Sequence, residues 1–373
     1  MKTPRLLRGP LGDDLVAALP GWVVARLAVA LGYVIAVIAS DELRSGSRTL
    51  QLRQGLFSWD AAWYRDIAER GYDGVAREGL RFFPLVPLAA RTLSVPLFGD
   101  VGLALVLIVN VAALGMGMAM HRLVSEETGN RARATRAAWL VTLLPSAVIL
   151  VLGYAEAVAM LLVITAFLML RRRRWIPAAV LGVLAGLCRP TGMLLALPAL
   201  VEVARGWNAA SDRPQRIAAV LGAPAGTAAY LAWVGWRYHD WALPLRLQNR
   251  ADLRGGWDDP LHAIWGSAKA LVSDGRIGDG LHIPWIGLFA VLLLVVFLKL
   301  PASYGLFSTA VLGLALSAHN LGSFERYGLF AFPLVIALAI VTDEERIERA
   351  VLVACGATLA GFTTLIFLGT FVP

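Results

Sequence analysis

Three carboxylates stand close together in an aromatic segment of an otherwise apolar chain. Asp60 and Asp66 lie six residues apart, and Glu69 follows three residues after Asp66. Trp59 and Trp63 flank Asp60, and tryptophan is enriched where a membrane meets water. An aspartate that is partly shielded from water can act as a general base for a hydroxyl group. The spacing alone fits equally an interfacial helix whose acidic face is solvated.

Helical geometry separates one of these acids from the other two. If the segment is a helix, Asp66 and Glu69 share a face with Ala62, whereas Asp60 points roughly the opposite way, beside Tyr64. The residue pattern alone does not select the acid that carries chemistry.

Two arginines stand at the ends of apolar runs. Arg189 lies between two such runs, and an arginine at membrane depth is a functional-site hypothesis by default. Its planar guanidinium suits phosphate recognition, and a snorkelling side chain at a helix end is the alternative. Arg326 opens a later run, where it can bind phosphate or form a surface ion pair with Glu325.

Further polar residues stand at the level of these arginines. Glu156 begins an apolar run, where it can hold sugar hydroxyls, pair with Arg189 or belong to a frayed, exposed helix end. His319 and Asn320 are candidates for substrate binding, with a satisfied helix end as the alternative for each. Gln248 lies in a polar cluster in which sugar recognition and ordinary loop polarity both fit. The sequence has no CxxC, HExxH, Walker or GxSxG motif, so metal and nucleotide chemistry gain no support.

The elements that must position these residues are membrane spans. The chain has 373 residues, of which 58% are hydrophobic and 16% charged, whereas soluble domains have about 25% charged residues. Apolar runs separated by short charged loops predict a polytopic, all-α membrane protein. No linker divides residues 1–373, so we expect a single domain. Cys188 and Cys355 lie in apolar runs, and a disulfide framework is therefore not expected.

Charge and parity predict the topology. About half of the 34 basic residues fall in short segments that share one side when the N-terminus is cytoplasmic. They do not form one basic face, so the net charge of +8 does not indicate nucleic acid. The long loops 40–98 and 237–283 then lie outside, as does the C-terminus. The eleven expected spans are 20–39, 99–121, 137–152, 155–170, 176–188, 191–204, 217–236, 284–299, 305–318, 327–342 and 350–371.

The spans between residues 137 and 204 are unusually short. Runs of about 13–16 residues reach only about 20–24 Å, less than a hydrocarbon core of about 30 Å. Pro145, Gly153, Pro177 and the Arg189-Pro190 step interrupt them. Such breaks are tolerated at membrane depth where the backbone is buried in protein or lines a cavity, and packing irregularity is the alternative.

Both long loops contain segments that face the membrane. In 260–273, apolar residues recur at helical spacing, which predicts an interfacial helix. The apolar segment 82–98 carries three prolines. It is too broken for a span, so we expect it to dip into the interface.

The first loop resembles a known family. Trp59-Asp60 is followed by IAERGY at 67–72 and by FFPLVP at 82–87. This combination is similar to the first luminal loop of the PIG-V-like mannosyltransferases, whose pattern is roughly WD…IA..GY…FFPLYP. Less specific similarities follow at 144–156, 188–192 and 325–333. There Leu144 and Thr191 each replace an asparagine of the family pattern, and Ala155 replaces a serine.

The resemblance implies a GT-C fold of many membrane helices with the active site at the non-cytoplasmic face. It implies inverting transfer of mannose from a polyprenyl-phosphate donor, without a metal or other cofactor. The Ala-, Leu-, Val- and Arg-rich composition resembles that of a high-GC bacterium and favours an actinobacterial source. In its plasma membrane the acceptor is expected to be a glycolipid or lipoglycan. The partners would be membrane lipids, donor and acceptor, and no nucleic acid.

By analogy with the family, Asp60 deprotonates the acceptor hydroxyl, and Arg189 and Arg326 are the candidates for the lipid phosphate. Asp66 and Glu69 are then scaffold or surface charge. The candidates for substrate binding are Trp59, Tyr64, Glu156, Gln248, His319 and Asn320.

A flippase or other transporter of lipid-linked sugars is the alternative function. A transporter is expected to carry charged residues near the bilayer midplane and often to show internal repeats. Neither feature is clear in this sequence, where most polar residues collect toward one predicted face.

Overall fold

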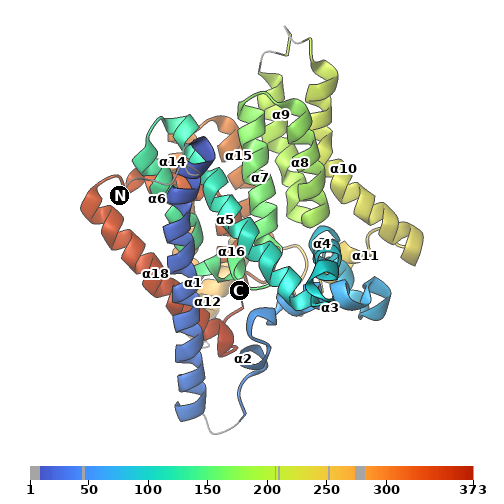
Figure 1. Cartoon of the computed structure of the whole chain (residues 1–373), viewed down its shortest axis with the longest axis vertical. Coiled ribbons are helices and arrows are strands. Elements are labelled where there is room, and N and C mark those ends of the chain that lie inside the picture. The colour runs from blue at the N-terminus through green and yellow to red at the C-terminus, as the bar shows by residue number, and fades with distance from the viewer. Residues whose placement is uncertain are drawn as a thin grey trace.

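The computed structural model describes residues 9–43, 47–205, 207–208, 211–250, 253–273 and 282–372. Within these ranges the chain is helical, without strands, and the bridge between Trp257 and Ala318 is isolated. The helices pack side by side into a bundle, and the short helices within residues 50–94 lie together at one end (Figure 1). The predicted all-α membrane fold class is confirmed.

The helices follow in chain order, with short 3-10 segments labelled η. The first part of the chain contains α1 (Pro10–Leu43), α2 (Leu50–Gln54), η2 (Gly55–Phe57), α3 (Asp60–Arg70), η3 (Tyr72–Gly74), η4 (Arg77–Arg81), α4 (Leu85–Ser94), η5 (Val95–Leu97), α5 (Val101–Thr128), α6 (Arg131–Leu143), η6 (Pro145–Leu150) and α7 (Glu156–Arg171). The second part contains α8 (Trp175–Cys188), η7 (Pro190–Leu195), α9 (Ala196–Ala204), α10 (Arg213–Tyr238), α11 (Leu243–Gln248), α12 (Pro260–Ser273), α14 (Ile283–Lys299), α15 (Ala302–Leu316), α16 (Phe324–Phe330), α17 (Pro333–Val341) and α18 (Glu345–Phe367).

Four of the described helices, α1, α5, α10 and α18, are long and apolar enough to cross a membrane by length and composition. The pair α16 and α17 passes the same test only together, and it bends by 81°. The other apolar helices are shorter. The count of eleven spans therefore stays a prediction. The first helix begins at Pro10 rather than at residue 20, and Pro20 lies inside it.

The expected breaks between residues 137 and 204 are present, with one exception. Helix α6 ends at Leu143, just before Pro145, and α8 ends before the Arg189-Pro190 step. The residue before a proline is disfavoured in a helix, which explains both ends. Pro177 was wrongly expected to interrupt a span. It lies in the first turn of α8, where a missing N–H leaves no helical bond unmade.

The irregular backbone of η6 is buried and receives hydrogen bonds from two spans. Arg26 of α1 donates to the Leu150 carbonyl at 3.1 Å and to the Asn110 side chain at 3.0 Å. Its guanidinium also lies over the ring of Trp22, 4.2 Å from the centroid. Asn110 of α5 donates to the Val151 carbonyl at 3.3 Å. Side chains of neighbouring helices thus satisfy the carbonyls that the break releases.

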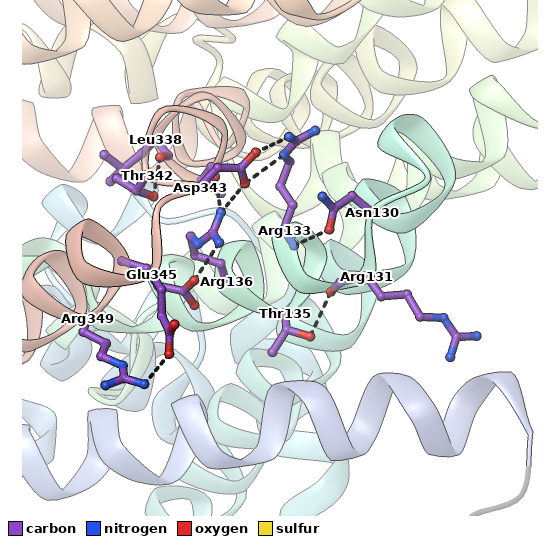
Figure 2. A network of polar contacts seen from close by, with 12 residues as sticks. Asn130, Arg131, Arg133, Thr135, Arg136, Leu338, Thr342, Asp343, Glu345 and Arg349 are labelled. Carbon is purple, nitrogen blue, oxygen red and sulfur yellow. Dashed lines mark hydrogen bonds and ion pairs between the residues drawn. The ribbon is translucent and has the colours of Figure 1, made fainter.

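An ion network joins α6 to the connection between α17 and α18 (Figure 2). The Arg136 side chain is only 4% exposed and lies 2.6 Å from both Asp343 and Glu348. It also donates to the Ala339 carbonyl at 2.7 Å. Arg133 pairs with Asp343 from the same helix. The buried charge of Arg136 is therefore matched on several sides.

A second ion network lies at the same end of the bundle, and helix α7 runs from this end to the opposite one. Arg171, the last residue of α7, contacts Glu127 and lies 3.0 Å from Glu202. Glu156 is the first residue of α7, and a helix of 16 residues is about 24 Å long. Charged residues thus collect at both ends of the bundle. Which end faces the cytoplasm stays a prediction.

The first loop packs on α10 near α11 (Figure 1). The Tyr230 hydroxyl of α10 donates to the Leu80 carbonyl at 2.9 Å. The Tyr230 ring packs against Phe83 with the centroids 4.5 Å apart, and against Tyr72 at 5.8 Å. These contacts fix the first loop relative to the span.

Two segments that were expected at the membrane interface are helical. The expected helix at 260–273 is confirmed as α12, and its Leu261 and Trp265 are exposed. The segment 82–98 forms α4 and η5, with Leu88, Val95 and Phe98 exposed. Exposed apolar side chains on both segments fit an interfacial position, which stays a prediction.

Arg136→Gln is expected to lower the free energy of unfolding by about 1–3 kcal/mol, because Asp343 and Glu348 lose charged hydrogen bonds at a buried donor. Thermal unfolding in detergent measures the change. Arg349→Gln is the matched control, since its pair with Glu345 is exposed and such pairs contribute little. If the two substitutions lowered the stability equally, the burial of Arg136 would not determine what its ion pairs contribute to stability.

Candidate functional site

The first loop folds so that Asp60 begins helix α3. Trp59, at the N-cap, has a φ of 58°, a left-handed conformation that is strained for a bulky residue. Its indole N–H donates to the Ile366 carbonyl of α18 at 3.3 Å. The Asp60 N–H donates to the Tyr154 hydroxyl at 3.2 Å. Contacts with two distant segments therefore fix where the Asp60 carboxylate lies.

Four charged side chains form a continuous ion-paired cluster, named here the site cluster: Asp60, Arg326, Glu156 and Arg189. Arg326 Nη1 lies 2.9 Å from Asp60 Oδ2, and its Nε lies 3.3 Å from Glu156 Oε1. Arg189 pairs with the same Glu156 oxygen. Glu156 is 1% exposed, whereas Asp60 is 33% exposed. Asp60 is thus the carboxylate of the cluster that a substrate can reach.

Helix ends place these charges where backbone dipoles favour them. Asp60 and Glu156 are the first residues of α3 and α7, and a helix N-terminus stabilises negative charge. Arg189 directly follows the last residue of α8, where the dipole favours positive charge. The breaks in the apolar runs therefore create the positions that the cluster occupies.

The other two acids of α3 lie on its more exposed face. Asp66 pairs with Arg70 at 2.8 Å, and Glu69 lies 3.6 Å from Arg65. Each pair spans one helical turn and is partly exposed. This arrangement fits their interpretation as surface charge.

Arg326 was considered as a possible partner of Glu325, but it pairs with Asp60 and Glu156 instead. Glu325 points elsewhere and contacts His282 Nδ1 at 2.8 Å.

His319 and Asn320 hold the second loop against the end of α15. His319 Nδ1 lies 2.8 Å from Asp258 Oδ2. The Asn320 side chain donates to the Leu253 carbonyl at 3.2 Å, and its backbone N–H donates to the Arg254 carbonyl at 3.0 Å. These contacts place both residues beside the loop that carries Arg254. Their role in substrate binding stays a prediction.

Hydrogen bonds from His319 and His262 lower the pKa of Asp258 to about 2. The unfolded pKa of an aspartate is near 3.9. Stabilisation by this carboxylate is therefore present above that value, and it is lost as the pH falls toward 2. At neutral pH Asp258 is ionised and can hold the loop.

The two remaining candidates for substrate binding lie in or beside the first loop. Gln248 accepts a hydrogen bond from Arg81 at 3.4 Å, so it lies against η4 of that loop. Tyr64 is buried, with its ring packed edge-on against Phe82 at a centroid distance of 5.1 Å. Tyr64 lies one helical turn after Asp60, as the helical spacing predicted.

Sequence reasoning gave no role to Tyr154, Tyr327 or Arg254. Tyr154 lies within the stretch 144–156, whose family resemblance could have indicated that this residue belongs to the site. Tyr327 follows Arg326 directly. Arg254 is a single basic residue in a long loop, and nothing in the local sequence distinguishes it. Its guanidinium lies 5.2 Å from the centroid of the Tyr327 ring.

Some buried polar atoms have no hydrogen-bond partner within the protein. Within the described residues they include Ser58 Oγ, Thr191 Oγ1, Glu156 Oε2 and Glu325 Oε2. Each lies in or within two residues of a cluster member. Leaving such an atom unsatisfied costs about 1–3 kcal/mol, so water or a bound polar ligand is expected to satisfy it.

No group of three or more His, Cys, Asp or Glu side chains in the described part of the chain could hold a metal ion. The charged partners of Asp60 and Glu156 are arginines. Metal independence of the reaction stays a prediction.

Arg26→Met is expected to loosen the segment 150–156, because the Leu150 carbonyl and the Asn110 side chain lose their donor. The loss of hydrogen bonds from a charged donor should cost about 1–3 kcal/mol of stability. Amide hydrogen exchange should rise in residues 145–156, which carry Tyr154 and Glu156. Arg48→Met is the matched control, since Arg48 forms an exposed pair with Asp41. Unchanged exchange at 145–156 would refute the role of Arg26.

Comparisons with known proteins give a family match for part of the chain. Residues 40–204 match the family model described as Mannosyltransferase (PIG-V). This match covers the first loop, Glu156 and Arg189, and it confirms the predicted resemblance for these parts of the chain. The stretch 325–333, which carries Arg326, lies outside the match. A search of curated proteins gives no match.

Among solved structures, the chain is similar to the oligosaccharyltransferase of Archaeoglobus fulgidus. The crystal structure of its complex with Zn and sulfate matches with a TM-score of 0.47 and 14% identity, over 91% of this chain and 52% of that chain. The archaeal oligosaccharyltransferase AglB of the same organism, with an inhibitory peptide and a dolichol-phosphate, matches with a TM-score of 0.43 and 13% identity, over 92% and 55% of the two chains. The chain thus spans about half the length of these proteins.

Proposed function

We propose that this chain, whose residues 40–204 match the PIG-V mannosyltransferase family, is a membrane mannosyltransferase of the GT-C type that uses a polyprenyl-phosphate mannose donor. The observation that carries the proposal is the site cluster. It brings a reachable carboxylate and two mostly enclosed arginines, each with a side chain 13% exposed, together at one end of a helical bundle. Transfer of a sugar from a lipid phosphate requires a carboxylate to accept the proton of the acceptor and cations to bind the phosphate.

Asp60 is the proposed general base. Arg326 holds its Oδ2 atom, so we assign Oδ1 to the proton of the acceptor hydroxyl. As that proton moves to Oδ1, the hydroxyl oxygen forms a bond with the anomeric carbon. The bond from this carbon to the phosphate oxygen breaks, and its electron pair leaves with the polyprenyl phosphate. Attack from the opposite face inverts the anomeric configuration.

The leaving phosphate gains one negative charge in this step. Guanidinium groups placed where charge develops lower the barrier of a reaction, and their planar forks match phosphate oxygens. Arg189 and Arg326 are the proposed groups. Glu156 lies between them with almost no exposure. We assign Glu156 the role of positioning both arginines, which makes Asp60 the better candidate for the base.

The proposal also includes the acceptor and the side of the membrane on which the site lies. A glycolipid or lipoglycan of the same membrane can present a hydroxyl at the level of the helix ends. The positive charge at the opposite end supports a site on the external face of a plasma membrane. The proposed partners are membrane lipids, the donor and this acceptor, without a cofactor.

A transfer assay in detergent tests the proposed function against transport. Purified protein would receive polyprenyl-phosphate mannose and glycolipid extracted from membranes. A transferase is expected to produce mannosylated lipid without sealed vesicles, because chemistry requires no compartments. A flippase would instead move the donor across vesicle membranes and yield no new lipid in detergent. Absence of sugar transfer to every extracted acceptor would refute the proposal.

Asp60→Asn is expected to reduce turnover by about 10²–10⁴-fold, because a positioned general base contributes a factor of that size. Donor binding should persist, since Arg189 and Arg326 keep Glu156 between them. Steady-state rates and donor affinity would be measured separately. Asp66→Asn, on the exposed face of the same helix, is the control and should retain activity. Near-normal turnover of Asp60→Asn would move the base to Asp66 or Glu156.

A further inference from the structure

The charges of the site cluster already cancel within it. Arg326 faces Asp60 and Glu156, and Arg189 faces Glu156, so two guanidinium groups are matched by two carboxylates. A phosphodiester brings one further negative charge. Burial of an unpaired charge is very costly, and a neutral cluster cannot balance it. A phosphate at this place therefore needs another positive group.

Arg254 is a further cation beside the helix that carries Arg326. Its guanidinium lies over the ring of Tyr327, 5.2 Å from the centroid, and Tyr327 is the neighbour of Arg326. Both Tyr327 and Arg326 belong to helix α16. None of the described carboxylates forms an ion pair with Arg254.

The position of Arg254 is fixed before any ligand binds. Its Nη2 donates to the Leu314 carbonyl of α15 at 2.8 Å, and its own carbonyl accepts the Asn320 N–H at 3.0 Å. Later in the same loop, the Asp258 N–H donates to the Ser317 carbonyl at 2.9 Å. A guanidinium held by backbone contacts keeps its charge unmatched and loses little freedom when it binds an anion.

We propose that Arg254, together with the Tyr327 hydroxyl, binds one phosphate group at the edge of the site cluster. If the proposed function holds, this group is the phosphodiester of the lipid-linked sugar. Arg326 can then remain on Asp60 while the phosphate binds. Arg254 consequently adds to the affinity for the phosphate beside Arg189 and Arg326, whereas Asp60 governs the rate of the chemical step.

Binding of polyprenyl phosphate to the purified full-length protein in detergent tests this proposal without any sugar transfer. Arg254→Gln is expected to weaken binding at least tenfold and to reduce its dependence on salt. Arg254→Lys should recover part of the affinity, because it restores the charge but not the planar fork. Binding of the uncharged polyprenol should not change. In a transfer assay, Arg254→Gln should raise KM for the donor more than it lowers kcat.

Arg246→Gln is the matched control, because Arg246 belongs to the same loop but pairs with Asp240 and is exposed. The affinity of the Arg246→Gln variant for polyprenyl phosphate should stay within about twofold of that of the parent protein, because exposed ion pairs contribute little. Tyr327→Phe is a second test and should weaken phosphate binding less than Arg254→Gln does. It keeps the ring on which Arg254 lies, so it tests the site if Arg254→Gln fails to fold.

The outcomes of these experiments distinguish a failure of the proposed phosphate site from a failure of the proposed enzymatic function. Equal affinity of the parent protein and Arg254→Gln for polyprenyl phosphate would overturn the proposal. Inorganic phosphate that binds as tightly as polyprenyl phosphate, and is weakened alike by Arg254→Gln, would support the phosphate site and overturn its lipid source. Arg254-dependent binding of polyprenyl phosphate without any mannose transfer would support the site and refute the proposed function.

Discussion

An ionised side chain inside an apolar bundle is stable only when opposite charges or backbone dipoles face it. This constraint organises both ends of the molecule. At one end Arg136 lies among two carboxylates and a carbonyl. At the other end Glu156 lies between two arginines. The helices must keep their register along the bundle, because a shift of one helix would leave the shielded charges of Arg136 and Glu156 without their partners.

The same constraint connects the broken helices with the site. A break in a span releases carbonyls and N–H groups, and it also produces helix ends with partial charges. Arg26 and Asn110 satisfy the released carbonyls on one side of the break after η6. On the other side Glu156 begins α7 and faces Arg189. The irregular region is therefore a structural requirement for holding charges within an apolar protein.

Much of this arrangement could be predicted from local sequence. The apolar runs gave the helical class, and Pro145 and Pro190 marked the ends of α6 and α8, because proline acts on the residue before it. Pro177 was misread because its effect depends on its place within the helix. The aromatic and acidic pattern around Asp60 singled out the first loop. In each case the physical cause acts within a few residues of the chain.

The sequence by itself determined the types of charge at the site, the helix ends that carry them and the family resemblance of residues 40–204. Only the tertiary structure decided which charges meet. Arg326 pairs with Asp60, 266 residues away in the chain, rather than with the adjacent Glu325. It also placed Arg254 beside Tyr327. Ion pairing depends on distance in space, and packing of whole helices sets that distance, so no local pattern encodes it.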